Sequence, residues 1–171
     1  YGDIMAGIVG LTELQHTNGT SAMVVDASGR VTQPQIPCCQ VRLTTSNAQD
    51  TSNPYSTTGT DIRFDSISLN QGSCYSESTG RFIVPVAGIY AVECQVLSDN
   101  SSTTNHQISI MKNGSALAYG YNSVDNQYVG LHAHQLVECA VNDYITVQLL
   151  QGVIYIDANG FFSSFTVKLV G

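Results

Sequence analysis

Hydrophobic and polar residues alternate along most of this chain with a period of two, and helical periodicity is almost absent. Between residues 88 and 97, for example, Tyr90, Val92, Cys94 and Val96 fall on one side of an extended chain. Such alternation is typical of strands with one buried face. It predicts strands at 39–43, 62–69, 88–97, 107–111, 117–121, 129–137, 145–149 and 164–169.

Turn sequences separate the predicted strands. Asn113-Gly114 follows the strand that ends at Met111 and favours a tight hairpin, while Ser78-Thr79-Gly80 precedes a strand that opens near Phe82. Asn142-Asp143 and Asn159-Gly160 close two later connections, and residues 48–59 read as a Ser/Thr/Asn-rich loop. Short strands at this spacing predict an all-β sandwich or jelly roll of about eight to ten antiparallel strands.

The first 35 residues have a different pattern. A turn at residues 17–20 precedes a short strand at 22–26, and a second turn at 27–30 precedes Val31-Thr32. We therefore expect residues 1–35 to form an anchoring hairpin and linker outside the main core, with the boundary near Pro34. Residues 36–171 would form the jelly roll.

Composition narrows the function classes. Only 11% of the 171 residues are charged, the formal net charge is −7, and the six Lys and Arg residues are scattered. A nucleic-acid binder carries a basic patch, so we expect no nucleic-acid partner. No apolar run approaches the ~20 residues of a membrane helix, so we expect no membrane insertion. The chain opens at Tyr1 with no visible signal peptide, so we expect a processed product or a fragment.

Five cysteines stand at positions 38, 39, 74, 94 and 139. The odd number argues against a complete set of disulfides. The chain also lacks the C-x-x-C pairs that a zinc ribbon needs. Cys94 and Cys139 fall inside apolar strand patterns, where a free thiol packs as a small hydrophobe. We expect all five thiols to be free.

A set of aromatic, Asn and Gly residues has the spacing of a known family signature. The matching positions are Phe64, Asn70, Tyr75, Phe82, Gly88 and Tyr90, and Phe165 lies in a similar closing strand. In these positions the chain resembles the complement globular-head domain and the tumour-necrosis-factor superfamily. The resemblance covers roughly residues 36–171. It implies a jelly-roll fold, a core role for the seven signature residues, and assembly as a homotrimer.

The N-terminal part carries a second resemblance. Asn18-Gly19-Thr20, Ala22-Met23 and the run from Asp26 to Val31 look like a segment of tailed-phage structural proteins, where it precedes a head domain. This resemblance implies a virion protein located on the virion surface.

His132 and His134 are the best candidate site. Two residues apart in a strand, they point to one face roughly 7 Å apart. The family resemblance implies that this face packs around a threefold axis. The predicted contact residues are Ile89, Ala91, Glu93, Tyr128, His132, His134 and Leu136. We expect interfacial histidines without a metal, and a metal held by His132 and His134 at the axis is the alternative.

No catalytic motif appears: the chain has no G-x-S-x-G, no H-E-x-x-H and no P-loop. We expect no catalytic residues and no cofactor. Predicted loops contain Asp99, Asp125, Asp143 and Asp157, but they lack the spacing of a calcium loop and read as solvated acids.

These observations predict a non-enzymatic, homotrimeric virion structural protein of a tailed phage, working as a capsid decoration, a fibre head or a host-binding tip. Its partners would be other copies of itself and either virion proteins or a host surface receptor. The alternative is a secreted, extracellular complement-like protein that recognises a carbohydrate or a protein receptor. A third class, a glycan hydrolase, would need paired acids in a groove, and the chain has only four Glu.

Overall fold

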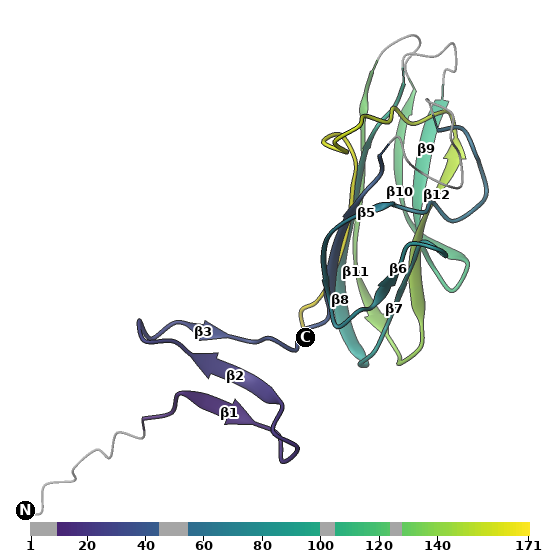
Figure 1. Cartoon of the computed structure of the whole chain (residues 1–171). Coiled ribbons are helices and arrows are strands. Elements are labelled where there is room, and N and C mark those ends of the chain that lie inside the picture. The colour runs from purple at the N-terminus through teal and green to yellow at the C-terminus, as the bar shows by residue number, and fades with distance from the viewer. Residues whose placement is uncertain (1–9, 45–54, 100–104, 124–127) are drawn as a thin grey trace, which may run out of the picture. The chain divides into compact units, whose positions relative to one another are not determined.

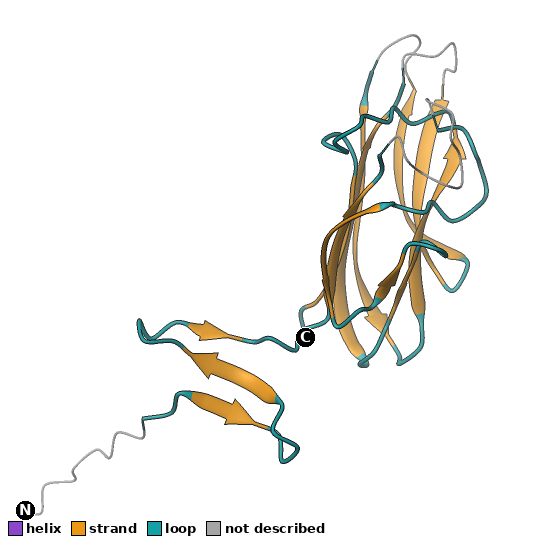
Figure 2. Ribbon diagram, in the orientation of Figure 1, coloured by secondary structure: helices purple, strands orange, loops and turns teal. Residues whose placement is uncertain are grey.

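A computed structural model describes residues 10–44, 55–99, 105–123 and 128–171, and every regular element in those ranges is a β-strand (Figure 2). The chain divides into two compact units, one ending at Ile36 and the other beginning at Pro37. The all-β prediction is confirmed. No helix in the described ranges has the length and apolar character needed to cross a membrane.

The N-terminal unit is an antiparallel three-stranded sheet of β1 (Glu13–Gln15), β2 (Ser21–Val25) and β3 (Val31–Thr32). Gly19 makes the first turn with φ at 85°. In the second turn, Asp26 Oδ1 accepts hydrogen bonds from the backbone N–H groups of Ser28 (2.8 Å) and Arg30 (3.0 Å). The sequence predicted only a hairpin here, because a three-residue strand with an exposed Leu14 leaves no alternation to detect.

The second unit is a sandwich of two five-stranded antiparallel sheets packed face to face (Figure 1). We call the sheet with strand order β11-β8-β13-β4-β5 the front sheet, and the sheet with order β10-β9-β12-β7-β6 the back sheet. The front-sheet strands are β11 (Gly130–Cys139), β8 (Gly88–Leu97), β13 (Ser164–Leu169), β4 (Cys38–Arg42) and β5 (Ser66–Gln71). The back-sheet strands are β10 (Ser115–Ser123), β9 (Asn105–Lys112), β12 (Tyr144–Gln151), β7 (Arg81–Ile83) and β6 (Tyr75–Ser76).

The core lies between the two sheets and comes from the alternation seen in the sequence. In β8, Tyr90, Val92, Cys94 and Val96 are buried, while the residues that alternate with them point away from the core. Because successive side chains point to opposite sides of a strand, each long strand supplies one buried row and one outward row. All five cysteines are free, as the sequence predicted. Burial raises the pKa of the Cys39 thiol to about 12, which makes that thiol unreactive at neutral pH.

Two predicted turns have the backbone that their residues favour. Asn113 and Gly114 have φ values of 50° and 80° and join β9 to β10, as in a type I′ hairpin turn. Asn142 also has a positive φ, at 71°, in the turn before β12. Asn113 and Gly114 fix where the β9–β10 hairpin reverses, and therefore which residues of these two strands are opposite one another. The Asn142 turn connects β11 of the front sheet to β12 of the back sheet.

The predicted strand at 62–69 is only partly correct, because β5 begins at Ser66. Ile62 and Phe64 are buried but precede β5, and the chain at residues 61–62 runs along β12 instead. The backbone N–H of Ile62 donates to Val147 O (2.8 Å), and Asp61 forms an isolated bridge with Gln148. The chain thus crosses from the back sheet to the front sheet within the predicted strand. Part of the predicted loop at 48–59 lies outside the described residues.

Candidate binding face

Three of the signature aromatics form one ring cluster in the core. Phe165 stacks on Phe64 with ring centroids 5.6 Å apart, and Tyr75 meets Phe165 edge-on at 6.3 Å. The Tyr75 hydroxyl donates to Phe64 O (3.0 Å), so the ring is buried with its polar atom paired. Burial raises the pKa of Tyr75, which keeps the hydroxyl protonated as a donor.

The remaining signature residues also hold the fold. Phe82 packs edge-on against Tyr90 at 5.8 Å, and the Tyr90 hydroxyl donates to Val86 O (2.7 Å). Asn70 closes the β5–β6 turn, because its side chain both accepts from Tyr75 N and donates to Tyr75 O at 3.0 Å. An added Cβ at Gly88 would lie 2.5 Å from the Gly171 carbonyl oxygen. Residue 88 must therefore be glycine for the C-terminal residues to pass beside it.

We define the front face as the outward side of β11, β8 and β13 in the front sheet. Its centre is polar: His134 is opposite Glu93, and His132 is opposite Gln95 in the β11–β8 ladder. Opposite residues in an antiparallel pair project to the same side, so the two histidines and Glu93 share this face. In the described part of the chain, no three His, Cys, Asp or Glu residues gather in a way that could hold a metal ion.

One end of the front face is aliphatic. Leu136 is 63% exposed and lies opposite Ala91, and Ile89 is 45% exposed and lies opposite Glu138. Lys168 lies opposite Ala91 from the β13 side. A shallow depression of about 310 Å³ opens here, and its lining includes Ala91, Glu93, His134, Leu136, Thr166 and Lys168. The predicted contact residues of β8 and β11 are therefore adjacent on one surface.

The other end is aromatic and lies where β8 ends and β11 begins. Tyr128 meets Tyr155 edge-on at 5.4 Å, and Tyr155 meets Phe162 at 5.9 Å. The Tyr155 N–H donates to Leu97 O (2.8 Å), which ties this cluster to the end of β8. Phe161 beside it is 70% exposed, with the Arg42 guanidinium 5.7 Å from its ring centroid. Partial desolvation, and then the nearby Asp99 carboxylate, raise the pKa of Tyr128.

Of this aromatic end, the sequence reasoning identified only Tyr128. Phe161 and Phe162 follow the Asn159-Gly160 turn directly, and Gly160 has φ at 63°. Adjacent aromatics directly after a turn point in different directions, so at least one of them is expected to be exposed. This pair was the feature of the sequence from which an exposed aromatic site could have been predicted. No pattern linked them to Tyr155, because the contact depends on how the β12–β13 connection folds.

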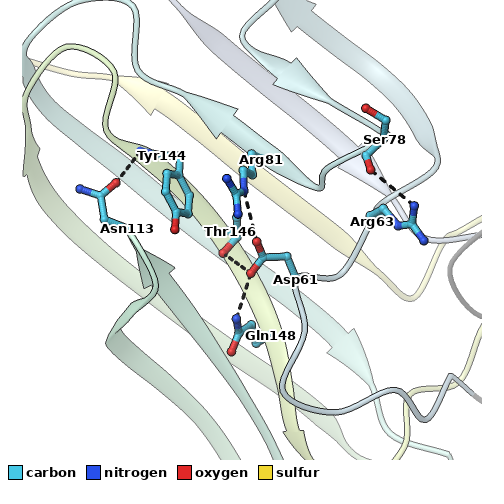
Figure 3. A network of polar contacts seen from close by, with 8 residues as sticks. All are labelled: Asp61, Arg63, Ser78, Arg81, Asn113, Tyr144, Thr146 and Gln148. Atoms are coloured by element: carbon cyan, nitrogen blue, oxygen red, sulfur yellow. Dashed lines mark hydrogen bonds and ion pairs between the residues drawn. The ribbon is translucent and has the colours of Figure 1, made fainter.

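A polar network occupies the outward side of the back sheet (Figure 3). Asp61 accepts hydrogen bonds from Thr146 Oγ1 (3.0 Å) and Gln148 Nε2 (2.9 Å), and it pairs with Arg81 Nε at 3.4 Å. The Arg81 guanidinium lies over the Tyr144 ring, 4.0 Å from its centroid. This network fastens the segment before β5 to β12 and β7.

The prediction that the loop acids are all solvated is wrong for Asp143. Asp143 accepts from Asn113 Nδ2 (2.7 Å) and the Ala140 N–H (2.8 Å), and it pairs with Lys112 Nζ at 2.9 Å. The Asn113 hydrogen bond, followed by that of Lys112, lowers the pKa of Asp143 to about 2. Asp157 caps its own turn by accepting from the Asn159 N–H (2.7 Å), and Asp125 lies outside the described residues. These two described carboxylates hold turns together rather than form an open calcium site.

Comparison with known proteins identifies the family. The family model described as "C1q domain" matches residues 45–167. The globular domain of zebrafish complement 1qA is similar over 80% of this chain and 98% of its own, with 13% identity and a TM-score of 0.61. The Eiger TNF of S. frugiperda covers 80% of this chain and 94% of its own, with 10% identity and a TM-score of 0.63. Murine APRIL, at 12% identity, covers 79% of this chain and 99% of its own with a TM-score of 0.58. With the jelly roll, the signature core and this match over most of its length, the chain belongs to the C1q domain family.

Proposed function

We propose that this chain is a non-enzymatic binding module that works as a homotrimer, with the front face as the contact between subunits. The observation that carries the proposal is the concentration of exposed apolar side chains at the two ends of that face. Leu136 and Ile89 lie at one end, and Tyr128 and Phe162, the latter 46% exposed, lie at the other. An exposed patch of this kind on a soluble domain marks an interaction surface.

A closed threefold arrangement suits such a face. Each copy contributes the same surface, so no apolar patch remains open after the ring closes. The polar centre, with His134 opposite Glu93, provides directional contacts between the two apolar ends. Apolar and aromatic side chains around a few polar groups are the usual composition of a subunit contact. We propose no metal at the histidines.

The non-enzymatic part of the proposal rests on the match to the C1q domain and on the use of three of the acids. The Asp61, Asp65 and Asp143 carboxylates accept hydrogen bonds that hold loops and turns in place. Glu93 lines the depression on the front face, and in this proposal it belongs to the contact between subunits. The proposed partners are other copies of the chain and a ligand bound by the assembled trimer.

For the setting, we propose the surface of a tailed-phage virion. The support is the N-terminal segment from Asn18 to Val31, whose resemblance to phage structural proteins falls on the two turns and on β2 of the small sheet. Partners would then be other virion proteins or a host surface receptor. Mass spectrometry and antibody labelling of purified particles test this setting: particle-bound chain at fixed copy number supports it, and chain found only in the particle-free fraction contradicts it.

The second candidate is a secreted recognition protein that binds a carbohydrate or a protein receptor. The likeness to zebrafish complement 1qA favours it. In that case the chain would be recovered from the medium of its producing cells as a free trimer, with no particle attached.

A matched pair of substitutions tests the trimer contact. Leu136→Asp places a charge at the aliphatic end of the front face, and Leu117→Asp places one on β10, where Leu117 is 37% exposed. An unpaired charge buried in a contact costs several kcal/mol, whereas an exposed one costs little. Sedimentation should show dissociation or insolubility for the first variant and an intact trimer for the second. Equal sedimentation of two folded variants would remove the front face from the contact.

A further inference from the structure

The described part of the N-terminal unit has no core of its own. From residue 10 to residue 36, no side chain is buried, whereas the jelly roll buries 28 hydrophobic side chains. An isolated hairpin is marginally stable at best, and a sheet of three strands needs an apolar face that packs against other groups. A unit of this size also lies below the length at which a domain usually folds without a disulfide, a metal or a partner chain. The sheet therefore needs a surface that the described residues of the unit do not supply.

The ladder sorts the side chains of this sheet onto two faces. Leu14 is opposite Met23, and Val25 is opposite Val31. Because Met23 and Val25 are two residues apart in β2, all four side chains project to the same side of the sheet. We call this side the apolar row. Glu13, Val24 and Thr32 form the other side, since Val24 is opposite both Glu13 and Thr32.

The apolar row crosses all three strands and carries no charge. Leu14 and Val31 at its two ends are each 54% exposed. The ionic groups among the described residues of the unit are elsewhere: Glu13 lies on the opposite side, and Arg30 pairs with Asp26 in the β2–β3 turn at 2.6 Å. Identical copies of this row can therefore meet without like-charge repulsion.

We propose that the occupant of the apolar row is the same row of two other copies, so that three N-terminal sheets form a short three-sided prism. The inference rests on the proposed homotrimer. Five residues separate β3 from β4, so the linker between the sheet and its own jelly roll is short, with a span of about 22 Å at most. Three jelly rolls held in one trimer therefore keep three sheets near one another, at an effective concentration on the order of millimolar.

Adjacent cysteine substitutions on the two faces test the prism. Val31→Cys puts a thiol on the apolar row, and Thr32→Cys puts one on the opposite side of the same exposed strand. Both are made in full-length chain carrying Cys38→Ser, which removes the one native thiol that is not buried. A short bismaleimide should cross-link Val31→Cys at least tenfold faster than Thr32→Cys, measured on denaturing gels after native treatment.

The outcomes separate this inference from the trimer. If light scattering gives a trimer but both variants cross-link at the same rate, the prism is wrong and the jelly-roll trimer stands; the apolar row would then fit a carrier protein. If the chain is a folded monomer, both proposals fail.

A charge on the apolar row, Val25→Asp, gives a second readout. Amide exchange in β1, β2 and β3 should become at least tenfold faster while the mass of the trimer is unchanged. Unchanged amide exchange in that trimer would also overturn the prism.

Discussion

The front and back sheets of the jelly roll share one core, yet their outward sides are built differently. On the back sheet, Asp61, Arg81 and Gln148 form a satisfied polar network that fastens a crossing segment to the sheet. On the front face, apolar side chains such as Leu136 and Phe162 are exposed at both ends. The back sheet also exposes Tyr119 and Tyr121 on its edge strand β10 and Ile83 on β7. The difference is the reason for proposing that another copy covers the front sheet, whereas a segment of the same chain covers part of the back sheet.

Removing one exposed aromatic from each sheet should distinguish the roles of the two sheets in assembly most clearly. Phe162→Ser takes away a ring that packs on Tyr155, and Tyr119→Ser takes away an exposed ring on β10. Loss of an aromatic that anchors a contact costs about 2 kcal/mol, which is roughly 30-fold in affinity. We expect that weakening of the trimer for Phe162→Ser and less than a twofold change for Tyr119→Ser, measured by dilution in mass photometry. The reverse order would assign the contact to the back sheet.

The back-sheet network should matter for stability and not for assembly. Asp61→Asn keeps the shape but removes the ion pair with Arg81 and weakens the bonds from Thr146 and Gln148. Hydrogen bonds to a charged group contribute about 1.5–3 kcal/mol, so we expect the free energy of unfolding to fall by about that amount. Denaturant titration measures it, and Glu77→Gln, at an exposed turn, is the matched control. A change in trimer affinity for Asp61→Asn would mean that the two sheets are not independent.

The smallest effect is expected at the end of the sandwich, where Asp143 pairs with Lys112. The Lys112 ammonium also donates to Glu138 O (2.8 Å), which links β9 of the back sheet to β11 of the front sheet. The pKa of Asp143 is lowered from 3.8 to about 2, so its stabilisation is complete above about pH 4 and is lost as the pH falls toward 2. The unfolding temperature of the wild type should fall between pH 4 and pH 2, and that of Asp143→Asn should fall less steeply with pH. Equal pH dependence of the two unfolding temperatures would show that the carboxylate does not link the sheets.

Much of the fold could be predicted from the sequence because local patterns determine it. The alternation around Tyr90 and Cys94 and the Asn113-Gly114 turn act within single strands and hairpins. Features that depend on distant contacts were missed. Ile62 and Phe64 alternate like a strand but precede β5, and Ile62 bonds to β12 instead. The fully buried His106 in β9 lies in a pattern that gives no sign of its burial.

The same limit applies to the candidate site. The outward positions of β8 and β11, from Ile89 to Leu136, follow from a period of two once the strands are recognised. Tyr155 and Phe162 do not, because they come from an irregular connection whose path only the folded chain defines. The polar network of Asp61 likewise joins residues more than eighty positions apart, which no sequence pattern brings together.

The mass of the purified wild-type chain in solution tests the central claim most directly. Multi-angle light scattering at micromolar concentration and neutral pH should give a single species of three times 18.3 kDa, the mass of one chain. A stable, folded species of 18.3 kDa under the same conditions would contradict the trimer, and with it the assignment of the front face as a subunit contact.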